Sequence, residues 1–310
     1  MPSRSPAPLT PLTKRISTGA IAIAVHDWGG DGPPVLLAHP TGFHGRIWAP
    51  VAARLIRSGR RVWSFDFRGH GDSDAPEDDD YSWHGFADDA LAVTEHLGIA
   101  GHPTLIAAGH SKGGAALVLA EAARPGTFAR LWLYEPVILP LDDPVAPMPD
   151  NPMATSARKR RNEWHSVEEA FTAYASKPPL DAMSPESLRA YVDYAFADRG
   201  DGVLALKCSP DVEAKVYAMS GSHGAFARLP LVACPTRVVV GETTSSIDVS
   251  IGRQLVDRLP RGTLEVMKGC GHFGPQQDPD TTAASITRFA PLPLPPLPSW
   301  RRFPGTIAGK

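Results

Sequence analysis

The chain has 310 residues, which is enough for one α/β domain of ~200–250 residues together with an inserted segment. Its 31 lysines and arginines nearly balance 33 aspartates and glutamates, so the charge gives no reason to expect nucleic acid or an anionic membrane as a partner. The three cysteines form no Cys-x-x-Cys pair, and no apolar run approaches the ~20 residues of a membrane span. We therefore expect a cytoplasmic protein with reduced thiols that acts on a neutral small molecule.

The two ends of the chain are rich in proline. Proline supplies no amide donor for a helix or a sheet, so residues 1–15 are predicted to form an extended N-terminal arm. Residues 291–310 are predicted to form a Pro-rich C-terminal tail for the same reason.

Between these ends, short apolar segments alternate with longer amphipathic ones. The start, residues 16–28, predicts an edge hairpin. Strands are predicted over residues 35–38, 62–66, 104–108, 131–134, 236–240 and 263–267. Helices are predicted over residues 48–57, 83–97, 113–124, 249–258 and 281–289. This order is typical of a mostly parallel, doubly wound sheet with helices on both faces.

The alternation stops after Pro136 and resumes near Pro230. A proline-rich stretch leads there into helical segments around residues 164–174, 185–196 and 210–219. The sequence therefore predicts a helical cap over residues 137–229, inserted into a core formed by residues 16–136 and 230–290.

The strongest chemical motif is Gly-His-Ser-Lys-Gly at residues 109–113. It follows a predicted strand and precedes a helix of small residues, the context in which a Gly-x-Ser-x-Gly turn presents a nucleophilic serine at a helix N-terminus. Ser111 is therefore the predicted nucleophile. We expect the neighbouring Lys112 side chain to be solvated or paired at the surface.

Four further motifs appear in order, and with the serine turn they resemble the α/β-hydrolase superfamily over roughly residues 16–290. They are His-Pro-Thr-Gly-Phe at 39–43, Asp-Phe-Arg-Gly-His-Gly-Asp-Ser at 66–73, Leu-Tyr-Glu-Pro at 133–136 and Gly-Cys-Gly-His-Phe at 269–273. The resemblance implies a capped serine hydrolase whose oxyanion hole consists of the amides of Thr41 and Lys112.

His272 is the predicted general base. Of the eleven histidines, it combines a position after the last strand with flanking glycines. His39 and His70 are expected to support their own loops through hydrogen bonds. No spacing of metal ligands is present, so we expect neither a metal nor a cofactor.

The acid of the triad departs from the pattern that the resemblance implies. Most of the family has Asp three residues after the glycine that ends strand 236–240, where this chain has Thr244. Three carboxylates compete for the role, namely Glu135 at the tip of the preceding core strand, Glu242 and Asp248. We favour Glu135, because some branches of the family place the acid there.

These residues predict acyl transfer to water, with cleavage of an ester or lactone of a small, largely apolar substrate. Hydrolysis of a carbon–carbon bond or acyl transfer to an alcohol stays open, because the same triad serves both. A ligand-binding relative without turnover is the alternative from another class, since Thr244 stands at the usual acid position. A monomer or a homodimer is expected.

Overall fold

A single eight-stranded sheet organises the core of the computed structural model, which describes residues 9–19 and 21–289. Its strands are β1 (Leu12–Ser17), β2 (Ala22–Gly29), β3 (Pro34–Ala38), β4 (Arg61–Phe65), β5 (Ile106–His110), β6 (Arg130–Tyr134), β10 (Thr236–Gly241) and β11 (Gly262–Met267). They lie in the order β1-β2-β4-β3-β5-β6-β10-β11. The pairs from β4 to β11 are parallel, and β1, β2 and β4 pair antiparallel at one edge. The predicted mostly parallel sheet is confirmed.

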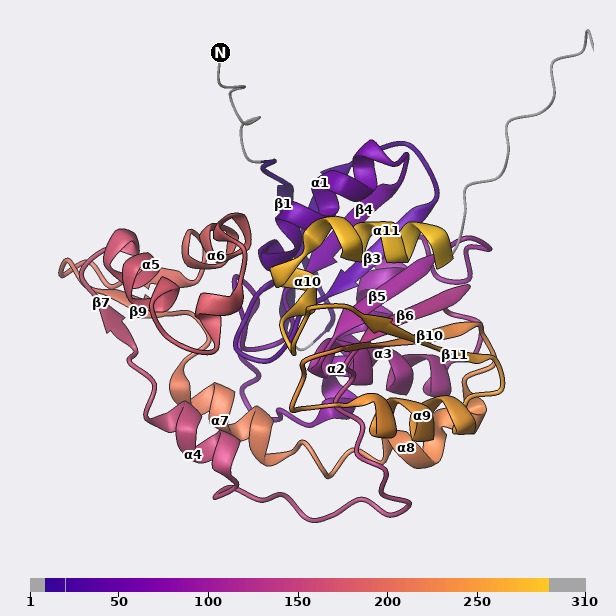
Figure 1. Ribbon diagram of the computed structural model, residues 1–310. Helices are drawn as coiled ribbons and strands as arrows, with labels where there is room; N and C mark the ends of the chain where they lie inside the picture. The colour runs from indigo at the N-terminus through magenta and orange to yellow at the C-terminus, as the bar shows by residue number, and fades with distance from the viewer. Residues whose placement is uncertain (1–8, 20, 290–310) are drawn as a thin grey trace, which may run out of the picture.

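Helices cover both faces of this sheet. Figure 1 shows α1 (Ala49–Arg57) and α11 (Pro279–Phe289) on one face, and α2 (Trp83–His96), α3 (Lys112–Ala123) and α9 (Val249–Arg258) on the other. Side chains of a strand point alternately to the two faces. In β3, Leu36 accordingly joins the apolar cluster on the α2–α3 side, whereas Val35 and Leu37 join the cluster on the α1–α11 side. The central strands β3, β5, β6 and β10 are therefore buried on both faces, as their continuous apolar sequences predict, whereas the edge strands β1 and β11 are partly exposed.

The order of the strands reverses at β3. From β3 the chain runs to β4 on one side, and it then crosses to β5 on the other side of β3. The loops that leave the carboxyl ends of β3 and β5 consequently diverge, which opens a crevice where α/β proteins bind ligands. The loop at residues 39–43 and the serine turn at residues 109–113 both lie at this end.

Most of the segment between β6 and β10 forms a group of elements beside the sheet, from α4 to α7, whereas its last helix, α8, lies near α9 and packs against α3 (Figure 1). The sequence predicts only helices here, but the segment also contains a three-stranded antiparallel sheet in the order β7-β9-β8. Strands of two or three residues are too short to show the hydrophobic alternation from which strands are predicted. Its elements are α4 (Pro152–Arg158), β7 (Glu163–Trp164), α5 (Val167–Ala175), α6 (Pro185–Val192), β8 (Phe196–Asp198), β9 (Leu204–Leu206), α7 (Pro210–Ala218) and α8 (Ala225–Arg228).

Polar contacts fasten this segment to the loops at the carboxyl end of the sheet. Nε2 of His44 donates to the carbonyl oxygen of Tyr191 in α6 at 2.9 Å. Lys207, which follows β9, forms an ion pair with Asp72 in the loop after β4. The inserted segment is therefore anchored on two of the loops that carry the sequence motifs.

The N-terminal part of the described chain corrects one prediction. The sequence places residues 12–15 in an extended arm, but they belong to β1, which pairs with β2 from Leu12 opposite Asp27 to Ser17 opposite Ala22. The prolines that motivated the arm end at Pro11, so the following amides are free to join the sheet. Residues 1–8 and the predicted tail at 291–310 lie outside the described residues.

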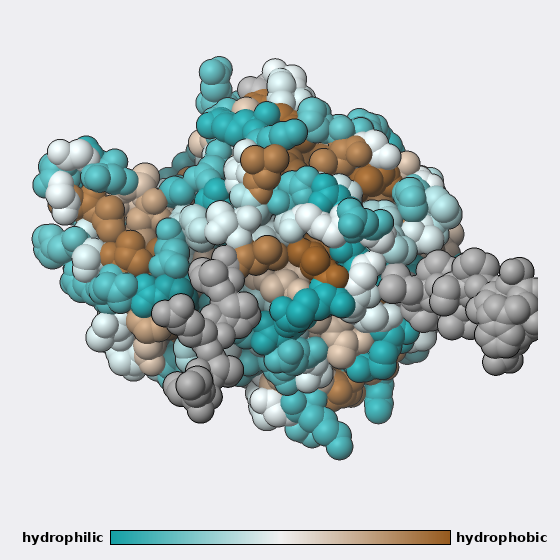
Figure 2. Space-filling view, turned by 90° about the horizontal axis from the view of Figure 1, so that it is seen from above, coloured by the Kyte–Doolittle hydropathy of each residue, from teal (hydrophilic) through white to brown (hydrophobic). Residues whose placement is uncertain are grey.

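The surface seen from above is mixed. Figure 2 shows hydrophobic patches that hydrophilic side chains separate from one another. Among residues 9–19 and 21–289, no helix combines the length and the apolar character that crossing a bilayer requires.

Candidate active site

Ser111 occupies a strained turn between β5 and α3. Its backbone has φ 55° and ψ −119°, a region that costs a non-glycine residue about 1–3 kcal/mol. Close packing holds the turn in place, because a Cβ on Gly113 would lie 2.4 Å from the carbonyl oxygen of Ala38 and one on Gly114 would lie 2.9 Å from Cβ of Pro136. Such a turn places a serine side chain above the sheet at a helix N-terminus.

His272 lies in the loop after β11 and contacts a buried carboxylate. Its Nδ1 donates to Oε2 of Glu135 at 2.7 Å, and the side chain of Glu135 is fully buried whereas that of His272 is 27% exposed. A carboxylate oxygen accepts in such a contact, so Nδ1 carries the proton, and in the neutral imidazole Nε2 is then the acceptor. The imidazole also lies beside the serine turn, because its centroid is 5.0 Å from that of His110, the residue before Ser111.

Glu135 is held rigidly at the tip of β6. Its backbone has φ 39°, and its amide donates to the carbonyl oxygen of Val239 in the neighbouring β10 at 2.8 Å. Its Oε1 accepts from the amide of Gly241 at 2.9 Å, and its Oε2 accepts from the hydroxyl of Thr244 at 2.8 Å. The residue at the usual acid position thus donates to the carboxylate that contacts the histidine.

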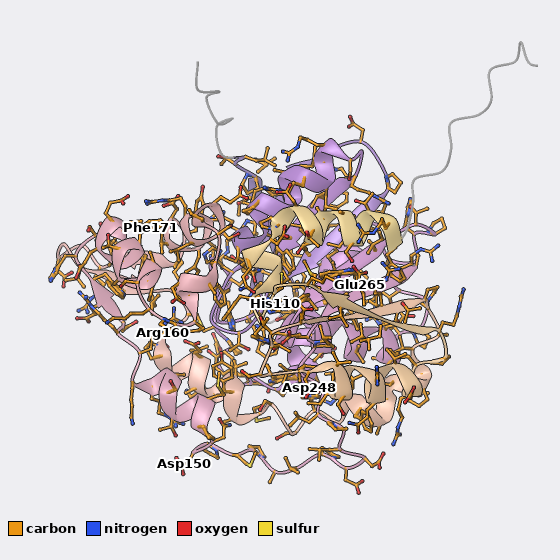
Figure 3. The ribbon with its side chains drawn as sticks, viewed as in Figure 1. His110, Asp150, Arg160, Phe171, Asp248 and Glu265 are labelled. Atoms are coloured by element: carbon orange, nitrogen blue, oxygen red, sulfur yellow. The ribbon has the colours of Figure 1, made fainter. Side chains whose placement is uncertain are left out.

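The two other candidate acids have different partners. Oε2 of Glu242 accepts from the amide of Gly269 at 2.9 Å. Oδ1 of Asp248 accepts from the amide of Ile251 at 2.9 Å and so caps the N-terminus of α9. Figure 3 shows Asp248 at the start of this helix, away from His110. Among the described residues, Glu135 is the carboxylate that hydrogen bonds to His272.

The amides expected in the oxyanion hole lie at adjacent strand ends. Thr41 follows β3, Lys112 begins α3, and both residues are buried. The missing side chain of Gly113 lets the start of α3 rest directly on the end of β3, since a Cβ there would also lie 2.8 Å from the carbonyl oxygen of His39. Within residues 9–19 and 21–289, neither amide donates to another protein group.

The structure corrects the expectation for the Lys112 side chain, which is fully buried rather than solvated. Its Nζ lies 4.2 Å from the ring centroids of both Phe67 and Phe86. Burial lowers the pKa of Lys112 to about 7. The sequence shows a charged residue in the first turn of a helix, but it does not show that two aromatic rings from other segments enclose it.

His39 and His70 do support their loops, as expected from the sequence. Nδ1 of His39 donates to the carbonyl oxygen of Pro40 at 2.7 Å, and its Nε2 accepts from the amide of Phe67 at 3.0 Å. Nδ1 of His70 donates to the carbonyl oxygen of Arg68 at 2.8 Å. Burial is the main cause that lowers the pKa of both histidines well below the usual value, so both are neutral near pH 7.

Sequence reasoning missed one residue that positions the His272 loop. The hydroxyl of Tyr134 donates to the carbonyl oxygen of Gly271 at 2.6 Å, and burial raises the pKa of Tyr134, so the hydroxyl keeps its proton. Its ring also meets that of His110 edge-on at 5.6 Å. The only sequence signal for Tyr134 is its position next to Glu135 at the end of a predicted strand. That position does not show that its hydroxyl contacts the loop of His272.

No metal centre accompanies these residues: within the described ranges, no group of three His, Cys, Asp or Glu side chains could hold an ion.

The comparison that decides the family is a match of residues 35–285 to the model of the alpha/beta hydrolase family. The chain belongs to this family.

Individual relatives agree with this assignment. Lipase LipV of Mycobacterium tuberculosis is 28% identical over 287 residues, which cover 87% of this chain and 99% of the lipase. Mouse protein phosphatase methylesterase 1 is 35% identical over 107 residues, but these cover 34% of this chain and 28% of the methylesterase. The chain thus matches little more than a quarter of the methylesterase and nearly all of the lipase.

The fold also matches a solved structure. The crystal structure of E-2-(acetamidomethylene)succinate hydrolase has a TM-score of 0.74 and 21% identity, and the match covers 90% of this chain and 98% of that one. At this identity the likeness shows the shared fold, and the reaction must be argued from the site.

Proposed function

We propose that the protein is a serine hydrolase that cleaves an ester or lactone of a small, largely apolar substrate through an acyl-enzyme. The observation that supports this most is the 2.7 Å contact from Nδ1 of His272 to the buried carboxylate of Glu135. This contact leaves the lone pair of Nε2 for the proton of a nucleophile, and Ser111 stands on the adjacent turn.

The proposed reaction follows from these positions. Oγ of Ser111 attacks the carbonyl carbon while Nε2 of His272 takes its proton, and the amides of Thr41 and Lys112 donate to the oxyanion. The carbon–oxygen bond then breaks, and His272 returns the proton to the leaving alcohol oxygen. A water activated by His272 hydrolyses the acyl-enzyme and regenerates Ser111.

Ester chemistry is also the chemistry named in the lipase and methylesterase relatives. The alternative of a ligand-binding protein without turnover was motivated by Thr244, but the hydroxyl of Thr244 donates to Glu135 instead of replacing the acid. The carboxylate is thus present, which favours the enzyme. Carbon–carbon bond hydrolysis, acyl transfer, a cytoplasmic location and a monomeric or homodimeric state stay predictions.

The test combines turnover with covalent labelling. Wild type is assayed on p-nitrophenyl acetate and butyrate, on simple lactones and on a β-diketone. Ser111→Ala is expected to lower kcat by about 10⁴–10⁶-fold and to abolish labelling by a fluorophosphonate, because no other group replaces the alkoxide. Ser58→Ala, at a partly buried serine after α1, is the matched control and should keep both signals. Labelling that persists at another serine in Ser111→Ala contradicts the assignment.

A further inference from the structure

The reaction proposed above uses the backbone of Lys112 and leaves its ammonium group without a role. This group is fully buried, and Nε2 of His70 lies 3.4 Å from Nζ. Within the described residues, Lys112 forms no ion pair with a carboxylate. A buried charge without such a partner is costly, so here the faces of Phe67 and Phe86 and the acceptor on His70 must stabilise it.

His70 and His39 connect Lys112 to the loop after β3. Nδ1 of His70 donates to Arg68, which leaves Nε2 as an acceptor for the ammonium group of Lys112. The ring of His39 lies beside that of His70, with centroids 5.1 Å apart. Lys112 therefore contacts one histidine of a neutral pair, and its charge also acts on the second.

The second histidine controls a peptide group of the proposed oxyanion hole. Nδ1 of His39 donates to the carbonyl oxygen of Pro40 at 2.7 Å. That carbonyl and the amide of Thr41 belong to one planar peptide, so the bond that fixes the carbonyl also fixes the direction of the N–H. The cluster of Lys112, His70 and His39 thus reaches from one proposed oxyanion amide to the other.

We propose that the side chain of Lys112 is a positioning residue for the oxyanion hole, which acts through His70 and His39 on the Pro40–Thr41 peptide and places a positive charge behind both amides. This inference rests on the proposed hydrolase function. Fixed dipoles and charges in a water-excluded site stabilise an oxyanion more than the same groups do in water. The cation therefore lowers the barrier without touching the substrate.

The surroundings of Lys112 determine how the effect depends on pH. The titratable and charged groups that face the cluster are His39, His44, His70, Asp66, Arg68, Asp89 of α2 and Cys208 of the inserted segment. Burial lowers the pKa of His44 to about 4, so this histidine is neutral near pH 7. Burial raises the pKa of the Cys208 thiol to about 12, so the thiol stays neutral, and His39 and His70 are neutral as well. Since the pKa of Lys112 is about 7, its positive charge is present below that pH and is lost above it.

The test replaces Lys112 by methionine, which has a similar length and suits the space between two phenylalanine rings. Lys112→Met should lower kcat on an activated ester at pH 6 by about 10- to 100-fold, somewhat less than the loss of a direct oxyanion donor. KM should stay within about threefold, and thermal stability should not fall, because the costly burial of a charge is removed. Lys14→Met, at an exposed lysine of β1, is the matched control.

A pH profile separates positioning from packing. The ratio of kcat/KM between wild type and Lys112→Met should be largest near pH 6 and should fall steadily above pH 7, to about one near pH 9, where wild type has lost nearly all of the charge. A constant ratio from pH 6 to pH 9 overturns the inference, and so does a kcat within about twofold of wild type at pH 6. Lys112→Leu serves as a second apolar variant if the methionine variant fails to fold.

A spectroscopic readout keeps failure of this inference distinct from failure of the proposed function. If wild type shows no turnover that depends on Ser111, the proposed hydrolase function is wrong. The positioning step is then read from the ring ¹⁵N signals of His70 and the amide signal of Thr41, which Lys112→Met should shift and Lys14→Met should not. A Thr41 amide signal that Lys112→Met leaves unchanged overturns the positioning role, whatever the turnover.

Discussion

Replacing Glu135 by glutamine is the sharpest test of the proposed triad, because the surrounding donors dictate how the amide must sit. The amide of Gly241 donates to Oε1, so the glutamine carbonyl is expected at that position. Its NH₂ then faces Nδ1 of His272, where Oε2 had accepted at 2.7 Å. The opposite orientation would set NH₂ against the Gly241 N–H and leave two donors unpaired, at a cost of about 1–3 kcal/mol.

The forced orientation predicts the wrong tautomer of the base. Facing an NH₂ donor, Nδ1 of His272 must accept, so the proton moves to Nε2 and Ser111 has no base. In a comparable Ser-His-Asp triad the same swap costs about 10⁴-fold in kcat, equivalent to about 5.4 kcal/mol of transition-state stabilisation. The expected result for Glu135→Gln is a loss of this size in kcat on p-nitrophenyl acetate, with an unchanged fold.

Two control variants make the same change from a carboxylate to an amide at the other candidate acids. Asp248→Asn keeps the cap of α9, because asparagine caps helices as well as aspartate does, and Glu242→Gln keeps a carbonyl acceptor for Gly269. Both variants should keep nearly full activity. A loss below about tenfold for Glu135→Gln beside a large loss for Asp248→Asn would refute the assignment of the acid.

Three further changes test the groups around this centre. Thr244→Val removes the hydroxyl that donates to Glu135, and we expect kcat to fall about tenfold with little change in thermal stability. Gly113→Ala places a Cβ 2.4 Å from a backbone oxygen at the end of β3, so denaturant unfolding should show a loss of about 1–3 kcal/mol or more. Arg160→Met leaves the buried carboxylate of Glu213 without its 2.8 Å partner and should destabilise by about 3–5 kcal/mol, whereas adding Glu213→Gln should restore much of this.

Local patterns sufficed for the core of the fold but not for the inserted segment. The central strands of the parallel sheet, β3, β5, β6 and β10, are buried on both faces and therefore have continuous apolar sequences, and the helices between the strands end at recognisable breaks. The elements of the inserted segment are shorter, and long-range contacts stabilise them. Arg160, for example, lies in the loop between α4 and β7, but it forms an ion pair with Glu213 in α7 and contacts the ring of Tyr191 in α6. Contacts between residues so far apart in the sequence leave no local pattern from which they could be predicted.

Burial of Lys112 escaped prediction for the same reason. A lysine beside a nucleophile looks like a solvated group, because lysine is rarely buried without a partner. Its environment comes from Phe67 in the loop after β4 and from Phe86 in α2, far from it in the sequence. Only the topology brings these rings to the first turn of α3, so no motif around residue 111 could have shown the enclosed charge.

Thr244 illustrates why one departure from a family pattern does not by itself mean that the carboxylate beside the histidine is lost. β6 and β10 are neighbours in the sheet, so the tips of both strands point at the same histidine loop. The carboxylate of Glu135 at the tip of β6 contacts His272, and Thr244 in the loop after β10 supplies a donor beside it. Its hydroxyl donates to Oε2 of Glu135 at 2.8 Å. Considered alone, Thr244 suggests that the carboxylate is missing. Considered together with Glu135, it indicates that the carboxylate has moved from the loop after β10 to the tip of the adjacent β6, where it still contacts His272.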